Sequence, residues 1–158
     1  MPKQILLDNA YLEMAKIWSQ LSKADRKKVG CIIVKDGSII SDGYNGTPIG
    51  FDNACEIELN INDCSVLKTK PEVLHAESNA ITKLAKSTHS SKDSTMYITI
   101  APCIDCAKLI IQSGIKRVVY KNNYKNLNGV NLLLKANIIV DCHEDKKVDM
   151  YKFTNQTT

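Results

Sequence analysis

The sequence predicts a three-layer α/β/α sandwich built around a five-stranded mixed sheet. A hairpin signal, Asp36-Gly37 between two apolar runs, lies in the first third of the chain. From residue 75 onward, helical and strand patterns alternate. Strands joined by a tight hairpin pair antiparallel, whereas strands joined by a helix run parallel, because a crossover needs about a dozen residues. The combination predicts a mixed sheet with helices packed on its faces.

The first half of the chain supplies one helix, two strands and a long loop. Residues 8–24 carry apolar side chains at helical spacing, and residues 29–35 and 39–44 are predicted strands on either side of the turn. Residues 43–70 are rich in Asn, Asp and Gly, and we expect a loop there, with a variable part at about 49–70. Loops of this length in compact domains are usually functional or mobile.

The second half alternates between helices and strands. We expect helices at 75–86, 103–113 and 127–136, strands at 95–100, 116–120 and 138–140, and a polar tail at 144–158. Gly114 is a typical helix terminator, which supports the end of the second of these helices. Gly129 weakens the prediction of the third helix, because glycine is unfavourable in a helix interior.

Length and composition describe an ordinary globular protein. The 158 residues fit one domain over 1–158, with 44% hydrophobic and 24% charged residues. No apolar run is long enough to span a bilayer, and residues 1–8 lack the basic and apolar blocks of a secretory signal, so we expect a cytoplasmic protein with no membrane partner. A formal net charge of +4 suits an anionic small molecule without demanding nucleic acid.

The cysteine spacing indicates a metal site. In a reducing cytoplasm, the six cysteines are metal ligands or buried residues rather than a disulfide framework. Cys103 and Cys106 are three apart, so on a helix both sulfurs lie on one face, and Pro102 directs the chain into that helix. The helix N-terminus favours the thiolate form. With His75 from the start of another helix, the set has three ligands and an open fourth position, which is typical of catalytic zinc.

Glu77 is the predicted catalytic residue. It follows His75 by two positions, so it faces away from that ligand and can act on a zinc-activated water as general base. The pattern His-x-Glu with Pro-Cys-x-x-Cys resembles the signature of zinc-dependent deaminases. In enzymes with this signature, zinc activates water for attack on C4 of cytosine, and the glutamate carries protons to N3 and to the departing amino group.

Three segments narrow the resemblance to one family. Residues 43–48 (GYNGTP), 75–81 (HAESNAI) and 102–108 (PCIDCAK) are similar to those of the deoxycytidylate (dCMP) deaminase family. The resemblance runs from the first helix to about Cys142. It implies a cytidine-deaminase-like fold, zinc as cofactor, and hydrolysis of dCMP to dUMP and ammonia, which supplies dUMP for thymidylate synthesis.

The resemblance also implies contacts to the nucleotide. Asn45 would hold the 3′-hydroxyl, the backbone of Ala76 would contact the base carbonyl, and Tyr124 would stack on the pyrimidine ring. Arg26 and Lys28 are the candidates for the 5′-phosphate, because guanidinium and ammonium groups bind phosphate well. Each has a plainer interpretation: Asn45 as a turn residue, Tyr124 as an exposed loop tyrosine, and the basic segment as a solvated surface.

Members of the family form homohexamers that dCTP activates and dTTP inhibits, with Mg²⁺ accompanying the nucleotide. If this carries over, the glycine-rich loop would contribute to an effector site through Gly43, Tyr44, Asn45 and Gly46. Cys55 and Cys64 lie in the variable loop without a clear four-ligand set, so we expect no second zinc.

Two alternatives stay open. One is a related deaminase that acts on a free nucleoside or on a base in tRNA or single-stranded DNA. A polynucleotide enzyme should carry a broader positive surface than +4 suggests, so no stable nucleic-acid partner is expected. The other is a non-catalytic zinc-binding protein. Glu77 argues against it, because a structural zinc site has no use for that carboxylate.

Overall fold

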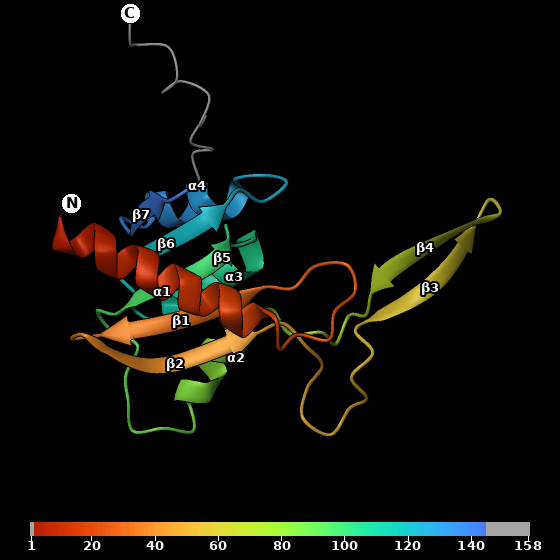
Figure 1. The fold of residues 1–158 in the computed structure, drawn as a ribbon, viewed down its shortest axis with the longest axis horizontal. Helices are drawn as coiled ribbons and strands as arrows, with labels where there is room; N and C mark the ends of the chain where they lie inside the picture. The colour runs from red at the N-terminus through yellow and green to blue at the C-terminus, as the bar shows by residue number, and fades with distance from the viewer. Residues whose placement is uncertain (1, 145–158) are drawn as a thin grey trace, which may run out of the picture.

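The computed structural model describes residues 2–144, and the predicted tail beyond residue 144 lies outside that range. The centre is a five-stranded sheet in the order β2-β1-β5-β6-β7 (Figure 1). Its strands are β2 (Ser38–Tyr44), β1 (Gly30–Lys35), β5 (Thr95–Ile100), β6 (Arg117–Asn122) and β7 (Ile139–Cys142). Strand β1 pairs antiparallel with β2 and β5, whereas β5, β6 and β7 run parallel. The predicted mixed sheet is confirmed.

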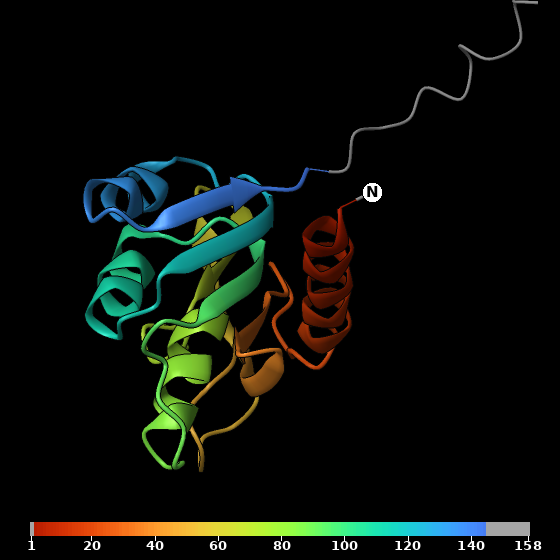
Figure 2. The same ribbon diagram turned by 90° about the vertical axis from the view of Figure 1, so that its left-hand side faces the viewer.

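Helices cover both faces of this sheet. Helix α1 (Lys3–Ser19) packs on one face, and α2 (Ala76–Leu84), α3 (Ile104–Gln112) and α4 (Asn128–Lys135) lie on the other (Figure 2). The core beneath α1 includes Leu12, Ala15, Ile32, Tyr97 and Val119. The larger core beneath the other helices includes Ile33, Ala80, Met96, Ile110 and Leu133. The three layers of the predicted sandwich are therefore present.

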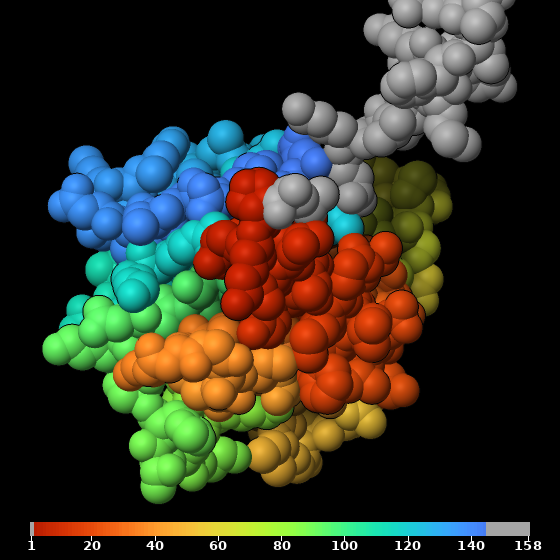
Figure 3. All heavy atoms as spheres, turned by 60° about the vertical axis from the view of Figure 1, so that its left-hand side comes forward, coloured from red at the N-terminus to blue at the C-terminus, as the bar shows by residue number. Residues whose placement is uncertain are grey.

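Helix α1 is displaced along the sequence relative to its prediction. It begins at Lys3, directly after Pro2, and ends at Ser19 rather than in the low twenties. Pro2 is suited to a helix start because the missing N–H would have no partner there. After the helix, the hydroxyl of Ser22 donates to the carbonyl of Asn45 at 2.7 Å, which ties the departing chain to the end of β2. Figure 3 shows α1 spread over the surface beside the β1–β2 edge.

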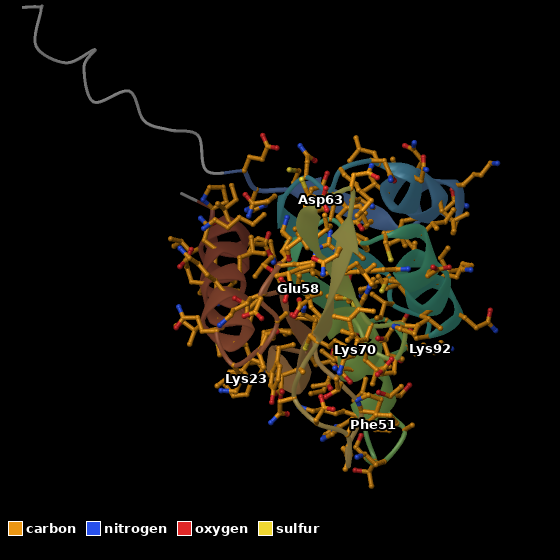
Figure 4. The ribbon with its side chains drawn as sticks, turned by 90° about the vertical axis from the view of Figure 1, so that its right-hand side faces the viewer. Lys23, Phe51, Glu58, Asp63, Lys70 and Lys92 are labelled. Carbon is orange, nitrogen blue, oxygen red and sulfur yellow. The ribbon has the colours of Figure 1, made fainter. Side chains whose placement is uncertain are left out.

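The predicted loop over residues 43–70 is wrong in part, because it contains a second, two-stranded sheet. Strands β3 (Glu56–Ile61) and β4 (Cys64–Thr69) pair antiparallel and project away from the body of the protein (Figure 1). Asn62 and Asp63 form the turn with φ of 50° and 61°, a conformation that Asn and Asp tolerate. In Figure 4, Asp63 marks this tip and Glu58 marks the middle of β3.

A buried ion pair joins α1 to the sheet. Arg117 on β6 donates to both carboxylate oxygens of Asp8, at 2.9 and 2.7 Å, and the hydroxyl of Tyr97 donates to the same carboxylate at 2.8 Å. Burial of Asp8 opposes its ionisation, but hydrogen bonds from Arg117, Gln4 and Tyr97 outweigh burial and lower the pKa of Asp8 to about 2. The ionised carboxylate therefore contributes to the packing of α1.

Among residues 2–144, no helix combines the length and the apolar character that crossing a membrane would require.

Replacing Asp8 should destabilise the fold strongly at neutral pH. Asp8 is 1% exposed, and Asp8→Asn would leave Arg117 with the partly exposed Asp141 as its remaining acidic partner, at a cost of about 1–3 kcal/mol. Because the folded-state pKa of Asp8 is about 2 and its ordinary value is 3.8, the stabilisation is complete above pH 4 and is lost as the pH falls towards 2. Urea unfolding at pH 7 and at pH 3 measures both effects.

The matched control is Asp36→Asn at the exposed β1–β2 turn, which should change the free energy of unfolding by less than about 0.5 kcal/mol. Equal effects of the two variants at pH 7 would show that the Asp8–Arg117 pair contributes no net stability.

Candidate active site

Two helix starts bring His75, Cys103 and Cys106 together. His75 is the N-cap residue of α2, Cys103 is the N-cap residue of α3, and Cys106 lies in the first turn of α3. The ligand atoms of all three lie within 4.8 Å of one another. Nδ1 of His75 is 3.5 Å from Sγ of Cys103 and 3.3 Å from Sγ of Cys106. The structure thus assembles the three residues that the spacing singles out as metal ligands.

The donor set and its spacing fit zinc. Tetrahedral bonds of about 2.0–2.1 Å to nitrogen and about 2.3 Å to sulfur separate the two ligand atoms by about 3.5 Å, close to the distances found here. The hydrogen bond with Cys106, together with that to His75, lowers the pKa of Cys103 to about 4, so this thiol readily becomes the thiolate that binds metal. Three protein ligands leave a fourth tetrahedral position open for water.

Glu77 lies beside this set, on the second residue of α2. Its side chain is buried, with 3% of the residue exposed, yet it lines the cavity that also contains His75 and Cys103. Burial raises the pKa of Glu77 to about 7, and the charge of His75 acts in the opposite direction. A carboxyl group in this position can accept and release protons next to the metal ligands.

Close backbone contacts fix the two helix starts. A Cβ on Gly43 of β2 would lie 2.2 Å from the carbonyl oxygen of Ala76, so only glycine lets β2 approach the start of α2 this closely. A Cβ on Gly129 of α4 would lie 2.1 Å from the carbonyl oxygen of Pro102. The glycine that weakens the prediction of the last helix therefore allows α4 to support the start of α3.

A cavity of about 330 Å³ opens beside the candidate metal ligands. The predicted residues Arg26, Asn45, Ala76 and Tyr124 line it together with Glu77. They come from the segment before β1, the end of β2, the start of α2 and the segment after β6. The sequence-based site thus gathers in one place although its members are distant in the chain.

Lys28 is the predicted contact that this cavity does not include. It lines a second cavity of about 250 Å³ together with Lys16, Lys27 and Lys121. Lys27 and Ile100 line both cavities, so the two adjoin. The assignment of Lys28 to the 5′-phosphate stays a prediction.

The amide of Asn45 shapes the cavity wall. Its oxygen accepts a hydrogen bond from the backbone N–H of Val29, and its nitrogen donates to the carbonyl of Lys27, both at 2.8 Å. This pair of bonds holds residues 27–29 against the end of β2. The side-chain nitrogen has a second hydrogen, which is available to a ligand in the cavity. The structural role and the predicted ligand contact are therefore compatible.

Tyr124 lies half-buried at the opposite wall. It packs against a small apolar cluster of Ala101, Tyr120 and Val130, and the amino group of Lys125 lies 5.5 Å from the centre of its ring. The ring is thus held by the body of the protein while it lines the cavity. An aromatic face in this position can stack on a planar base.

Sequence reasoning missed the contribution of the β3–β4 hairpin. Glu56 and Thr69, which pair with each other at the base of the hairpin, line the same cavity. The carboxylate of Glu56 accepts hydrogen bonds from the backbone N–H groups of Asp25 and Arg26 at 3.2 Å. The alternation of polar and apolar residues over 56–61 is the signal that could have revealed these strands.

The glycine-rich loop also borders a third cavity of about 580 Å³. Gly43, Tyr44 and Gly46 line it, as do Lys83 and Lys86 of the adjoining helical segment. The side chain of Asn45 faces the other way, into the cavity beside the candidate metal ligands. The loop therefore separates two cavities.

Comparison with known proteins agrees with this geometry. The family model described as the cytidine and deoxycytidylate deaminase zinc-binding region matches residues 6–122. The chain belongs to this family. Among curated proteins, it resembles the deoxycytidylate deaminase of Enterobacteria phage T4, with 37% identity over 78% of this chain and 82% of the relative. The deoxycytidylate deaminase of Mycobacterium phage D29 is also 37% identical, over 72% of this chain and 92% of the relative.

A solved structure extends the likeness to three dimensions. The dCMP deaminase from the cyanophage S-TIM5, solved in complex with dCMP and dUMP, superimposes with a TM-score of 0.78. It has 43% sequence identity, and the match covers 90% of this chain and 98% of that chain. The fold of this family member is therefore the cytidine-deaminase-like α/β sandwich.

Adding one methyl group at Gly129 should disturb the metal site of this deaminase-family protein. Gly129→Ala would place a Cβ against Pro102 and Cys103, so the start of α3 must move and the Cys103 sulfur with it. We expect the affinity for zinc to fall about 10-fold or more. Losses of this size are typical when a residue that supports a metal ligand is changed. Competition with a chromogenic chelator measures it.

The control is Gly46→Ala, where a Cβ meets no atom within 4 Å. It should bind zinc as the unmodified protein does. Unchanged zinc affinity in Gly129→Ala would show that α4 does not determine the position of Cys103.

Proposed function

We propose that this chain catalyses the hydrolytic deamination of dCMP to dUMP and ammonia. The observation that carries the proposal is a single cavity with His75, Cys103 and Glu77 at one end and the cationic Arg26 in its wall. In a cytosine nucleotide, the base would lie against His75, Cys103 and Glu77, and the phosphate would lie against Arg26. The names of the phage relatives support the same substrate. The product would supply thymidylate synthesis in the cytoplasm.

The chemistry follows from the residues around the base. His75, Cys103 and Cys106 would hold a zinc ion, which would supply a Lewis acid that makes water nucleophilic near neutral pH. Glu77 accepts the proton from the attacking water and delivers it to N3 of cytosine. It then takes the proton of the new hydroxyl on C4 and transfers it to the amino group, so that the C4–N bond breaks, ammonia leaves and the carbonyl of uracil forms. Burial of Glu77 keeps bulk water from competing for these protons.

Four further residues orient the nucleotide. The backbone of Ala76 contacts the base carbonyl, and the ring of Tyr124 stacks on the pyrimidine. The free amide hydrogen of Asn45 binds the 3′-hydroxyl. Arg26 binds the 5′-phosphate, because a guanidinium group matches phosphate geometry. All four line the cavity, which supports these roles.

We also propose regulation at the glycine-rich loop. The cavity bordered by Gly43, Tyr44 and Gly46 includes Lys86 and also Lys83, whose amino group pairs with Asp42, and these ammonium groups would suit a nucleoside triphosphate. In this proposal dCTP activates and dTTP inhibits, Mg²⁺ accompanies the triphosphate, and the chain works as a homohexamer. The loop adjoins both cavities, so an effector that moves it also moves Asn45 in the substrate cavity.

A substrate panel tests the function directly. Deamination of dCMP, deoxycytidine, cytidine and dCTP is followed by ultraviolet absorbance, each with and without added dCTP or dTTP. We expect turnover of dCMP alone, raised by dCTP and lowered by dTTP. Glu77→Gln removes the proton carrier but no metal ligand, so this variant should keep its zinc. Its turnover should fall roughly 100-fold or more, as expected for the loss of a general base.

Turnover of dCMP in Glu77→Gln at the unmodified rate would contradict the assigned proton transfer. The second candidate function is deamination of a base in a polynucleotide, which the four lysines of the adjoining cavity favour. No turnover of any monomer by the zinc-loaded protein, together with salt-sensitive binding of single-stranded DNA or tRNA, would replace dCMP with a polymer.

Arg26 should distinguish the nucleotide from the nucleoside. Arg26→Ala removes a charge-assisted hydrogen bond to phosphate, worth about 1.5–3 kcal/mol, so kcat/KM for dCMP should fall roughly 10- to 100-fold. The much slower reaction of deoxycytidine should change little. The control is Lys23→Ala, a nearby exposed cation that does not line the cavity and is labelled in Figure 4. Equal losses for dCMP and deoxycytidine would remove Arg26 from the phosphate site.

A further inference from the structure

We propose that Glu56 is an internal competitor of the substrate phosphate: its carboxylate and the 5′-phosphate bind the same backbone N–H groups of Asp25 and Arg26. Glu56 would thereby set the affinity for phosphate-bearing ligands and couple their binding to the β3–β4 hairpin. The inference rests on the proposed function, and it assigns a specificity role to a hairpin that sequence reasoning left as a loop.

The hydrogen bonds define an anion site. Oε1 of Glu56 accepts from the N–H groups of Asp25 and Arg26, each at 3.2 Å, and Oε2 accepts from the N–H of Asp25 at 3.2 Å. Successive backbone N–H groups that converge on one anion form a nest, a feature that binds carboxylate and phosphate alike. The guanidinium of Arg26 lies beside it and donates to Thr69, the residue paired with Glu56.

Charge repulsion prevents the Glu56 carboxylate and the 5′-phosphate from binding the same N–H groups at the same time. Arg26, Lys27 and Lys125 bring positive charge to the cavity, and Glu56 and Glu77 are its acidic lining residues. Glu77 lies beside the candidate metal ligands, so Glu56 is the acidic residue of the cavity lining that lies next to Arg26. A nucleotide phosphate carries nearly two negative charges at neutral pH and repels a carboxylate held on the same donors. Phosphate must therefore displace Glu56 from the two N–H groups.

The hairpin can accommodate that displacement. Strands β3 and β4 pair with each other and make no extensive contact with another helix or strand of the described residues (Figure 1). An isolated two-stranded hairpin is only marginally stable in water. Its ties to the Asp25–Arg26 segment are the Glu56 bonds and the Arg26–Thr69 bond. A ligand that takes these donors releases the hairpin, whereas a nucleoside leaves it in place.

The deciding variant is Glu56→Gln, which keeps the size and one acceptor oxygen but removes the charge. Loss of a competing, partly exposed charge should tighten the binding of dUMP and of inorganic phosphate about threefold to tenfold. Deoxyuridine, which lacks phosphate, should bind both proteins equally. Calorimetry on the zinc-loaded protein measures all three ligands without relying on turnover.

The matched control is Glu58→Gln, a neighbouring acidic residue on β3 whose carboxylate is hydrogen bonded to Ser65 instead of the Asp25–Arg26 segment. It should leave all three affinities unchanged. In the unmodified protein, dUMP but not deoxyuridine should accelerate amide hydrogen exchange over residues 56–69.

Weaker binding of dUMP and phosphate by Glu56→Gln would overturn the inference, because Glu56 would then be a brace that holds Arg26 in place. Unchanged or undetectable binding of both ligands would overturn it as well. The proposed function fails separately, through absent turnover of dCMP by the unmodified protein. Tighter phosphate binding by the variant would still establish the competition in that case.

Discussion

The site depends on bringing the N-termini of α2 and α3 close enough for one histidine and two cysteines to share an ion. Each helix follows a connection from the sheet, so its direction is set by the strand and the core beneath it rather than by the ligand itself. Close backbone contacts then fix the positions of the two helix starts. Gly43 lets β2 approach the start of α2, and Gly129 lets α4 approach the start of α3. The ligand atoms then lie within 4.8 Å of one another, and the proximity of the two thiols lowers the pKa of Cys103 to about 4. Backbone packing around the two helix starts thus determines how the candidate metal ligands are placed.

The same scaffold explains why one cavity can hold both ends of a nucleotide. Asn45 closes β2 and binds the backbone on both sides of Lys28, so the segment that carries Arg26 is fixed relative to α2. Tyr124 is held by a separate apolar cluster after β6. A base, a sugar and a phosphate would therefore meet residues from three parts of the chain that are rigid for different reasons. Such preorganisation favours orientation over raw affinity, which is what a hydrolytic reaction on a small substrate requires.

Local patterns in the sequence predicted the five strands of the main sheet and the four helices in their order along the chain, because hydrophobic periodicity is a property of neighbouring residues. Helix-start spacing also singled out the three residues that the structure brings together as candidate metal ligands. Helix α1 begins and ends earlier than predicted, and its buried Asp8–Arg117 pair joins residues far apart in the chain, which local periodicity does not register. The hairpin was missed because its strands are largely exposed and rich in polar residues, although the alternation in 56–61 and the Asn62-Asp63 turn were present. Lys28 shows what a sequence pattern does not determine about a side chain. It is adjacent to Lys27 in the chain, yet it lines only the second cavity, whereas Lys27 lines both.

The hairpin also bears on how a deaminase site discriminates among phosphate-bearing molecules. Positive charge alone would attract any phosphate-bearing molecule. A carboxylate placed on the same N–H groups lowers that general attraction, because each anion must first replace Glu56. A ligand that also fits the base end of the cavity has further contacts to offset this cost, whereas inorganic phosphate has none. Weakening the phosphate contact by an internal anion therefore transfers discrimination to the base and sugar, where the reaction takes place.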